Sequence, residues 1–252
     1  MQLIEFIFFG FFICIGTLIL VTPLISLTKK PHLMDVFWSI GICFSILVST
    51  WFFSPEIIMS APIIMVTLWG IRLSCFLFYT RILNDFTDRR YEKQRTSSYF
   101  RLAFKHAMIQ APMQALFLFT IYPIILTPNL NMSCIIVGSC IFFLGLLGET
   151  IADFQLYTHK KNSNGLMKQG LWKYSRHPNY FFETLVWIGI SVTFIGNPGS
   201  FISFIGPLSI FIITYFITGR ITESSSIERY KSDFKTYQRE TSYFFPWKVN
   251  HD

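Results

Sequence analysis

Charged residues are scarce in this sequence. They make up 14% of its 252 residues, whereas a typical soluble domain contains roughly 25%. Hydrophobic residues make up 52%, and apolar runs of about 18 residues or more recur, which is the length needed to cross a hydrocarbon core of about 30 Å. This composition argues against an ordinary soluble domain and predicts an all-α, polytopic membrane protein.

Several functional signatures are also missing. No Cys-x-x-Cys pair occurs, and all five cysteines lie in apolar runs, so they are interpreted as small hydrophobic residues and not as disulfides or metal ligands. The five histidines form no His-x-x-His or His-x-x-x-His pair, which argues against a di-iron desaturase or hydroxylase, and no metal is predicted. Without a Gly-x-Gly-x-x-Gly or Walker loop, no soluble nucleotide-binding module is expected.

Seven apolar segments are expected to cross the membrane. They cover, approximately, Ile4–Leu27, Val36–Phe53, Ile57–Tyr79, Ala107–Thr127, Met132–Tyr157, Asn179–Ile195 and Phe201–Thr218. The first lacks a basic region before it and an Ala-x-Ala cleavage site, which favours a retained span over a signal peptide. No internal repeat or low-complexity linker divides the chain. A single seven-span membrane domain is therefore expected over residues 1–252.

Lysine and arginine are distributed unequally among the connectors. All 21 fall in the first, third and fifth connectors, in the C-terminal tail, or at Arg72 in the adjacent half of the third span. Because cytoplasmic loops collect these residues, the pattern predicts an N-terminus outside the membrane and a cytoplasmic C-terminus. The net charge of +7 reflects this asymmetry and requires no nucleic-acid partner.

Ionisable residues within the apolar segments are costly and usually functional. The sequence places five of them toward the predicted cytoplasmic side: Asp35, Arg72, Glu149, Asp153 and Glu183. Glu149 and Asp153 are four residues apart and so share one helical face. Two interpretations are open, namely a structural network of ion pairs between helices or a cytoplasmic-side polar cavity that receives a water-soluble cofactor. The second is favoured because separate segments place polar groups at one depth.

The polar and aromatic stretch Gly170–Glu183 enters the sixth expected span. Pro178 suits the first position of a helix and presents Asn179 at the helix start, where free N–H groups and the helix dipole favour an anionic or carbonyl-bearing ligand. Arg176 adds a guanidinium suited to phosphate. An interfacial aromatic belt explains the aromatic residues of this stretch, but not its Arg-His-Pro-Asn core.

The pattern Gly-Leu-Trp-x-Tyr-Ser-Arg-His-Pro-Asn-Tyr-Phe-x-Glu over residues 170–183 resembles the signature of the steroid 5-alpha-reductase C-terminal-like family. It is closest to the bacterial branch of that family, most of whose members lack an assigned substrate. The C-terminal signature covers about residues 132–248, and the resemblance reaches nearly the whole chain. Its other pieces are Asp35-x-x-Trp38, Arg72-Leu73, Asp88-x-Arg90-Tyr91, Glu149-x-x-x-Asp153-x-Gln155, Arg229-Tyr230, Tyr237, Thr241 and Phe245-Pro246.

The resemblance implies an NADPH-dependent reductase that acts on the C=C bond of a steroid-like or other lipid enone in the bacterial inner membrane. Its expected partners are this lipid-like substrate and membrane lipids. The cofactor-binding residues that it implies are Glu149, Asp153, Arg176, His177, Asn179, Tyr180, Glu183, Arg229 and Tyr230, with Arg220 as a further phosphate partner. Asp35 falls where these reductases place a carboxyl group toward the substrate carbonyl, and Tyr79 is a weaker analogue of their substrate tyrosine. These two are the implied catalytic residues.

One position departs from the family pattern, and two other functions stay open. Phe182 stands where the family usually has glycine, so the backbone there is expected to approach a ligand less closely. Isoprenylcysteine carboxyl and phospholipid methyltransferases, which use S-adenosylmethionine, also carry Arg-His-Pro-x-Tyr before a late span. The Glu149/Asp153 pair and the Asn-Tyr-Phe-x-Glu spacing favour the reductases over them. A non-catalytic lipid or sterol binder on the same scaffold is the third reading.

Overall fold

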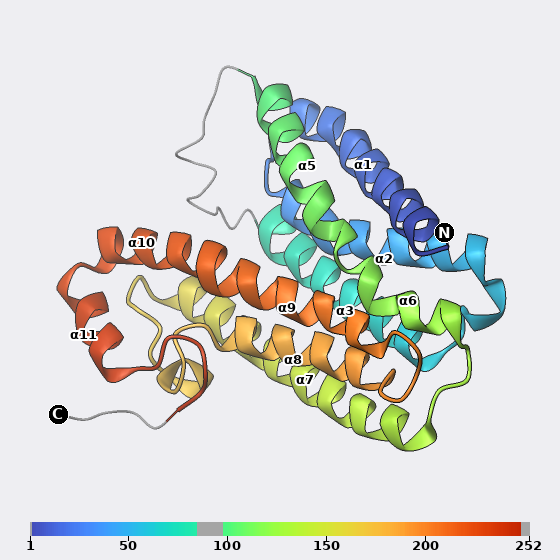
Figure 1. The fold of residues 1–252 in the computed structure, drawn as a ribbon. Helices are drawn as coiled ribbons and strands as arrows, with labels where there is room; N and C mark the ends of the chain where they lie inside the picture. The colour runs from blue at the N-terminus through green and yellow to red at the C-terminus, as the bar shows by residue number, and fades with distance from the viewer. Residues whose placement is uncertain (1, 85–97, 248–252) are drawn as a thin grey trace. The chain divides into compact units, whose positions relative to one another are not determined.

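The computed structural model describes residues 2–84 and 98–247, and within these ranges every regular element is a helix (Figure 1). The all-α expectation is therefore confirmed. The α-helices are α1 (Gln2–Thr28), α2 (Leu33–Phe53), α3 (Ala61–Leu77), α5 (Tyr99–Ala115), α6 (Leu118–Leu126), α7 (Met132–Asn162), α8 (Pro178–Val192), α9 (Ile205–Ile212), α10 (Gly219–Tyr230) and α11 (Ser232–Glu240). Asp88, Arg90 and Tyr91, which belong to the resemblance, lie outside the described residues.

Shorter helical turns connect or extend these helices. They are the 3-10 helices η1 (Pro55–Ile57), η3 (Gly170–Lys173) and η4 (Ser200–Phe204), and the π-helices η2 (Phe78–Leu83) and η5 (Ile213–Thr218). The π-helix η2 lengthens α3, and η5 joins α9 to α10 without a break. A chain that looks like a polar tail in the sequence therefore continues as helix beyond Thr218.

Among the described residues, six helical segments are long and apolar enough to cross a membrane. They are Leu3–Thr28, Leu33–Phe53, Ala61–Leu83, Tyr99–Leu126, Met132–Asn162 and Ser200–Tyr230. The expected count of seven is not confirmed, because the sixth expected span forms α8, which has 15 residues. At 1.5 Å per residue, α8 extends about 22 Å, which is short of a hydrocarbon core of about 30 Å.

The chain divides into two compact units. Unit 1 comprises Met1–Ile136 and Ile190–Gly206, and unit 2 comprises Val137–Gly189 and Pro207–Asp252. Each unit is built from two separate stretches of chain. The expectation of a single domain stays a prediction.

Unit 1 has a core formed by α1, α2 and α5. The buried side chains of α1 recur at helical spacing, at Cys14, Leu18, Val21 and Ile25. Those of α5 are alanines four residues apart, at Ala103, Ala107 and Ala111. Small residues at this spacing let two helices approach closely, and α1 and α5 accordingly run side by side (Figure 1).

A buried glutamine ties α5 to α2 within unit 1. Nε2 of Gln114 lies 3.2 Å from the carbonyl oxygens of both Phe37 and Trp38, and the side chain is fully buried. The space for this amide comes from Gly41, where an added Cβ would lie 2.7 Å from Gln114 Oε1 and 2.8 Å from Nε2. Gly41 is thus required by a polar contact inside the bundle.

We expect Gly41→Ala to lower the midpoint of thermal denaturation. The methyl group displaces the Gln114 amide, and each lost hydrogen bond costs about 0.5–1.5 kcal/mol net. Gly16→Ala on α1 is the matched control, because a Cβ at Gly16 meets no atom within 4 Å and alanine is the better helix former by about 1 kcal/mol. Thermal denaturation of the detergent-solubilised variants checks this, and an equal loss in both would contradict it.

Unit 2 is built on the pair α7 and α8, which run side by side (Figure 1). Gly145 and Gly148 on α7 face Phe182 and Val186 on α8. A Cβ at Gly148 would overlap the Phe182 ring, so this glycine provides the room that the ring occupies. The glycine that the family pattern places at position 182 is thus replaced here by a phenylalanine packed against a glycine of the neighbouring helix.

Candidate functional site

The connector between α7 and α8 is attached to α7 through its residues Leu171 and Trp172. Gly170 adopts a φ of +58°, a left-handed conformation that favours glycine. The amide nitrogen of Leu171 then donates to Gln155 Oε1 at 3.0 Å, and Nε1 of Trp172 donates to the carbonyl of Ala152 at 2.9 Å. The Gly-Leu-Trp part of the sequence pattern therefore anchors the connector on α7, next to Asp153.

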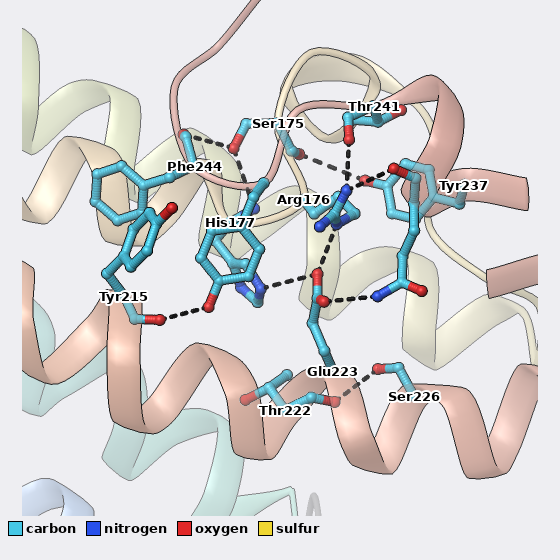
Figure 2. A network of polar contacts seen from close by, with 12 residues as sticks. Ser175, Arg176, His177, Tyr215, Thr222, Glu223, Ser226, Tyr237, Thr241 and Phe244 are labelled. Atoms are coloured by element: carbon cyan, nitrogen blue, oxygen red, sulfur yellow. Dashed lines mark hydrogen bonds and ion pairs between the residues drawn. The ribbon is translucent and has the colours of Figure 1, made fainter. Parts of the chain in front are cut away.

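The second half of the connector is held by the C-terminal strap, which we define as residues 241–247 (Figure 2). Backbone and hydroxyl groups join the two segments: Arg176 N donates to Ser242 O at 2.8 Å, Ser175 Oγ to Phe244 O at 2.7 Å, and Trp247 N to Tyr174 O at 3.0 Å. The hydroxyl of Tyr237, from α11, donates to the carbonyl of Trp172. The sequence Tyr-Ser-Arg-His is thus shaped by chain about 65 residues further on.

Arg176 is the central cation of this network. Its Nε donates to Glu223 Oε1 at 2.5 Å, and its Nη1 donates to the carbonyls of Gln238 at 2.9 Å and Thr241 at 2.6 Å. Its guanidinium lies 5.3 Å from the centre of the Tyr243 ring. Arg176 therefore joins the connector to α10, α11 and the strap, and the phosphate role that the resemblance implies for it stays a prediction.

His177 is enclosed by side chains from three elements. Its ring stacks on Tyr180 with centroids 5.2 Å apart, meets Tyr243 edge-on at 4.9 Å, and places Nε2 3.6 Å from Glu223 Oε1. It is 4% exposed. Burial lowers the pKa of His177, Arg176 adds to this lowering, and Glu223 opposes it, so the imidazole is neutral near pH 7.

Stability should fall on acidification because of His177. The folded protein binds this proton at lower pH than the unfolded chain, whose histidine pKa is about 6.5. Below that pH the unfolded state binds more protons, so the free energy of unfolding decreases as pH falls toward the folded pKa. Thermal denaturation at pH 7.5 and 5.5 should therefore show a larger drop for the wild type than for His177→Asn. Equal drops would contradict the prediction.

Tyr243 fastens the strap to the π-helix η5. Its hydroxyl donates to the carbonyl of Tyr215 at 2.6 Å, and the two rings meet edge-on with centroids 4.8 Å apart. Burial raises the pKa of Tyr243 to about 12, so the hydroxyl keeps its proton over the physiological range. A π-helix interrupts the regular α-helical ladder and often marks a functional position. Here the carbonyl of Tyr215 in η5 accepts the hydrogen bond from Tyr243 of the strap.

The facing surfaces of α7 and α8 carry the acidic and amide groups that the sequence singled out. Nδ2 of Asn179 donates to Asp153 Oδ1 at 3.1 Å. One turn further into each helix lie Glu149 and Glu183. Because the two helices run antiparallel, with Gly145 opposite Val186, these glutamates lie at the same level. They are 2% and 9% exposed.

The side-chain oxygen of Asn179 is available to accept a hydrogen bond. Its Oδ1 is buried and has no hydrogen-bond partner within residues 2–84 and 98–247. Buried polar atoms in proteins are nearly always paired, so an unpaired acceptor beside a helix start points to a ligand with an N–H or O–H group. The set Glu149, Asp153, Asn179 and Glu183 can therefore form one polar wall of a binding site in unit 2.

The other candidates of unit 2 occupy different surroundings. Arg229 is exposed at the end of α10, with its guanidinium 5.0 Å from the Tyr230 ring centre, and Tyr230 is half-buried. Tyr230 lies two helical turns after Glu223, on the same face of α10. Arg220 is exposed at the start of that helix. The structure thus groups Arg176 and His177 with Glu223, and Asp153 with Asn179, while Arg229 and Arg220 face outward.

The proposed substrate residues belong to unit 1. Asp35 forms an ion pair with Arg81, which belongs to η2, and Lys30 Nζ donates to the carbonyl of Ile82 at 3.0 Å. Tyr79 lies on the same π-helix and is 51% exposed. Arg72 has its guanidinium 5.6 Å from the ring centre of Phe76. The ion pair thus joins the first turn of α2 to η2.

Sequence reasoning missed Glu223 in the site. This residue is buried at 9% exposure and meets Arg176, His177 and Gln238. It lies in the polar run Thr-Glu-Ser-Ser-Ser, which resembles a solvated helix surface, so one sequence contains no signal for it. The sequence analysis also did not single out Tyr243, which lies in the stretch after Thr218 that has the composition of a polar tail.

The model of the family described as "Protein of unknown function (DUF1295)" matches residues 23–241. The matched region contains α2 to α11 in full and ends at the first residue of the strap. No curated protein and no solved structure matches the chain significantly.

Proposed function

The chain belongs to the DUF1295 family, and on this premise we propose that it is a membrane-embedded, NADPH-dependent reductase of the C=C bond of a steroid-like or other lipid enone. The resemblance to steroid 5-alpha-reductases supports the reaction class, since its motif pieces run from Asp35 to the strap. The six apolar helices support a membrane location and hence a lipid substrate. The proposed orientation of the protein, with the N-terminus outside, rests on the distribution of lysine and arginine. The proposed location in the bacterial inner membrane rests on the bacterial branch that the chain resembles.

The observation that carries the proposal is the polar wall of unit 2. Glu149, Asp153, Asn179 and Glu183 come from two facing helices, and Asn179 Oδ1 is a buried acceptor without a partner. These groups fit a cofactor that carries amide and hydroxyl donors, as the nicotinamide and ribose of NADPH do. The Asn179 acceptor is available to such a donor, because it has no hydrogen-bond partner within the described residues.

In this proposal the residues of the chain bind and orient; NADPH, when bound, would supply a hydride to one carbon of the C=C bond, and water would supply the proton for the other carbon. Asp153 fixes the Asn179 amide through its hydrogen bond, and Glu149 and Glu183 present acceptors to hydroxyl groups. Asp35 and Tyr79 are proposed to polarise the acceptor carbonyl. A carboxylate paired with Arg81 only accepts hydrogen bonds, so Asp35 can donate one only after it separates from that arginine and takes up a proton, whereas a tyrosine hydroxyl such as that of Tyr79 can donate one.

Thermal denaturation of the detergent-solubilised protein with NADPH, NADH or S-adenosylmethionine tests the proposal. A ligand that binds only the folded state stabilises it by about 2.7 kcal/mol at a hundred times its dissociation constant. A shift with NADPH that exceeds the shift with NADH is expected. A shift with S-adenosylmethionine alone would replace the proposal by a methyltransferase, and no shift with any of the three would favour a non-catalytic lipid binder.

A further inference from the structure

We infer that Glu223 is a positioning residue for the start of α8, because its carboxylate fixes Arg176 and lies against His177, and Arg176 in turn fixes the segment that places Asn179. The inference rests on the proposed function, since it assigns Asn179 to a nucleotide site. Glu223 itself lies on α10, more than 40 residues later in the chain. No motif of the sequence points to it.

The carboxylate of Glu223 meets three side chains from two parts of unit 2, the connector and α11 (Figure 2). Oε1 accepts the hydrogen bond from Arg176 Nε at 2.5 Å and lies 3.6 Å from His177 Nε2, while Oε2 accepts from Gln238 Nε2 of α11 at 2.7 Å. Both oxygens are thus engaged, and the group holds the connector and α11 to one point of α10.

A charge is required at this point. The side chain of Arg176 is 10% exposed, and a buried cation whose carboxylate is removed leaves an uncompensated charge, which is strongly destabilising locally. The two carbonyls that Nη1 contacts do not replace an anion. Without the Glu223 carboxylate, Arg176 is therefore expected to turn toward water and to lose its hydrogen bonds to the carbonyls of Gln238 and Thr241.

The link from Arg176 to Asn179 is short and restrained. Pro178 fixes the backbone φ between them, and His177 N donates to Ser175 Oγ at 3.1 Å. Movement of Arg176 and His177 therefore passes directly to the first turn of α8. A hydrogen bond that is misaligned by this movement loses much of its net contribution to binding, so a residue that never touches the cofactor can still change its affinity.

The test compares NADPH affinity among matched variants, measured by nicotinamide fluorescence in detergent. Glu223→Gln keeps the size of the side chain and removes the charge, and we expect it to weaken NADPH binding about tenfold, which corresponds to the loss of one hydrogen bond of about 1.4 kcal/mol. Glu223→Asp, which keeps the carboxylate, should recover much of the affinity. Glu228→Gln, the same change at an exposed position of α10, should bind as the wild type does. Equal affinity of the Glu223→Gln and Glu228→Gln proteins would overturn the inference.

A second measurement separates this inference from the proposed function. If the wild type does not bind NADPH, the proposed function fails, and amide hydrogen exchange over residues 174–182 of the nucleotide-free protein decides the positioning role. Faster exchange in Glu223→Gln than in Glu228→Gln supports it, and equal rates overturn it. Should Glu223→Gln not fold, Glu223→Asp is compared with Glu228→Asp in the same way.

Discussion

Replacing Asn179 with alanine is expected to abolish the stabilisation of the protein by NADPH. The change removes the hydrogen bond to Asp153 and the buried Oδ1 acceptor that has no partner in the described part of the chain. With NADPH at a hundred times the wild-type dissociation constant, the wild type gains about 2.7 kcal/mol. The variant should gain none.

Two comparisons make this result specific. Without nucleotide, Asn179→Ala should denature close to the wild-type temperature, because one side-chain hydrogen bond contributes only about 0.5–1.5 kcal/mol. Asn164→Ala, the same change in an exposed part of the connector, should keep the full NADPH shift. A wild-type shift in Asn179→Ala would show that the start of α8 is not part of the cofactor site.

The second large effect is expected at the crossing of α7 and α8. A Cβ added at Gly145 would lie 2.6 Å from the backbone nitrogen of Val186 and 2.8 Å from the carbonyl oxygen of Phe182. Both are backbone atoms of a helix, so the helices must move apart. Overpacking of this kind costs about 1–3 kcal/mol. Gly145→Ala is therefore expected to lower the denaturation midpoint by several degrees, at about 2–4 °C per kcal/mol.

This substitution should also weaken NADPH binding, because separating α7 from α8 separates the carboxylates of one helix from Asn179 on the other. Gly165→Ala, in the exposed connector where the nearest atom is Ser163 Oγ at 3.2 Å, is the control for a glycine-to-alanine change in unit 2. Denaturation curves with and without NADPH measure both effects. A Gly145→Ala protein as stable as the Gly165→Ala protein would contradict the close packing of the two helices.

The fold class was predictable because it depends on composition. Runs of apolar residues long enough to span a bilayer must form helices, since no water is available there for the backbone groups. The limits of the helices were harder to predict. The sequence assigns residues after Thr218 to a polar tail, but η5 and α10 continue the helix to Tyr230, and Glu223 is buried by α11 and the connector, which a local reading does not see.

In the candidate site, too, some features could be predicted from the local sequence and others could not. Glu149 and Asp153 share a face by their spacing, and Pro178-Asn179 is a helix start by its chemistry, so both were predictable. The partner of Arg176 was not, because a guanidinium suits phosphate and carboxylate equally well. Only the contact with Glu223 shows which anion it meets in the folded chain. In the same way, the sequence predicts that Phe182 keeps the backbone away from a ligand, whereas in the structure its ring packs against Gly148 of α7.

The sequence by itself determined that this protein is an all-helical membrane protein, where its apolar segments lie, and which residues of the α7 and α8 regions are polar within them. These properties follow from hydropathy, charge and helical spacing, which act over a few turns. The tertiary structure alone decided that α8 is short, that the C-terminal strap shapes the connector, and that Glu223 holds Arg176 beside His177. Those features depend on contacts between residues far apart in the chain. Charged residues such as Glu223 and Arg176 meet and become buried only when the helices pack against one another.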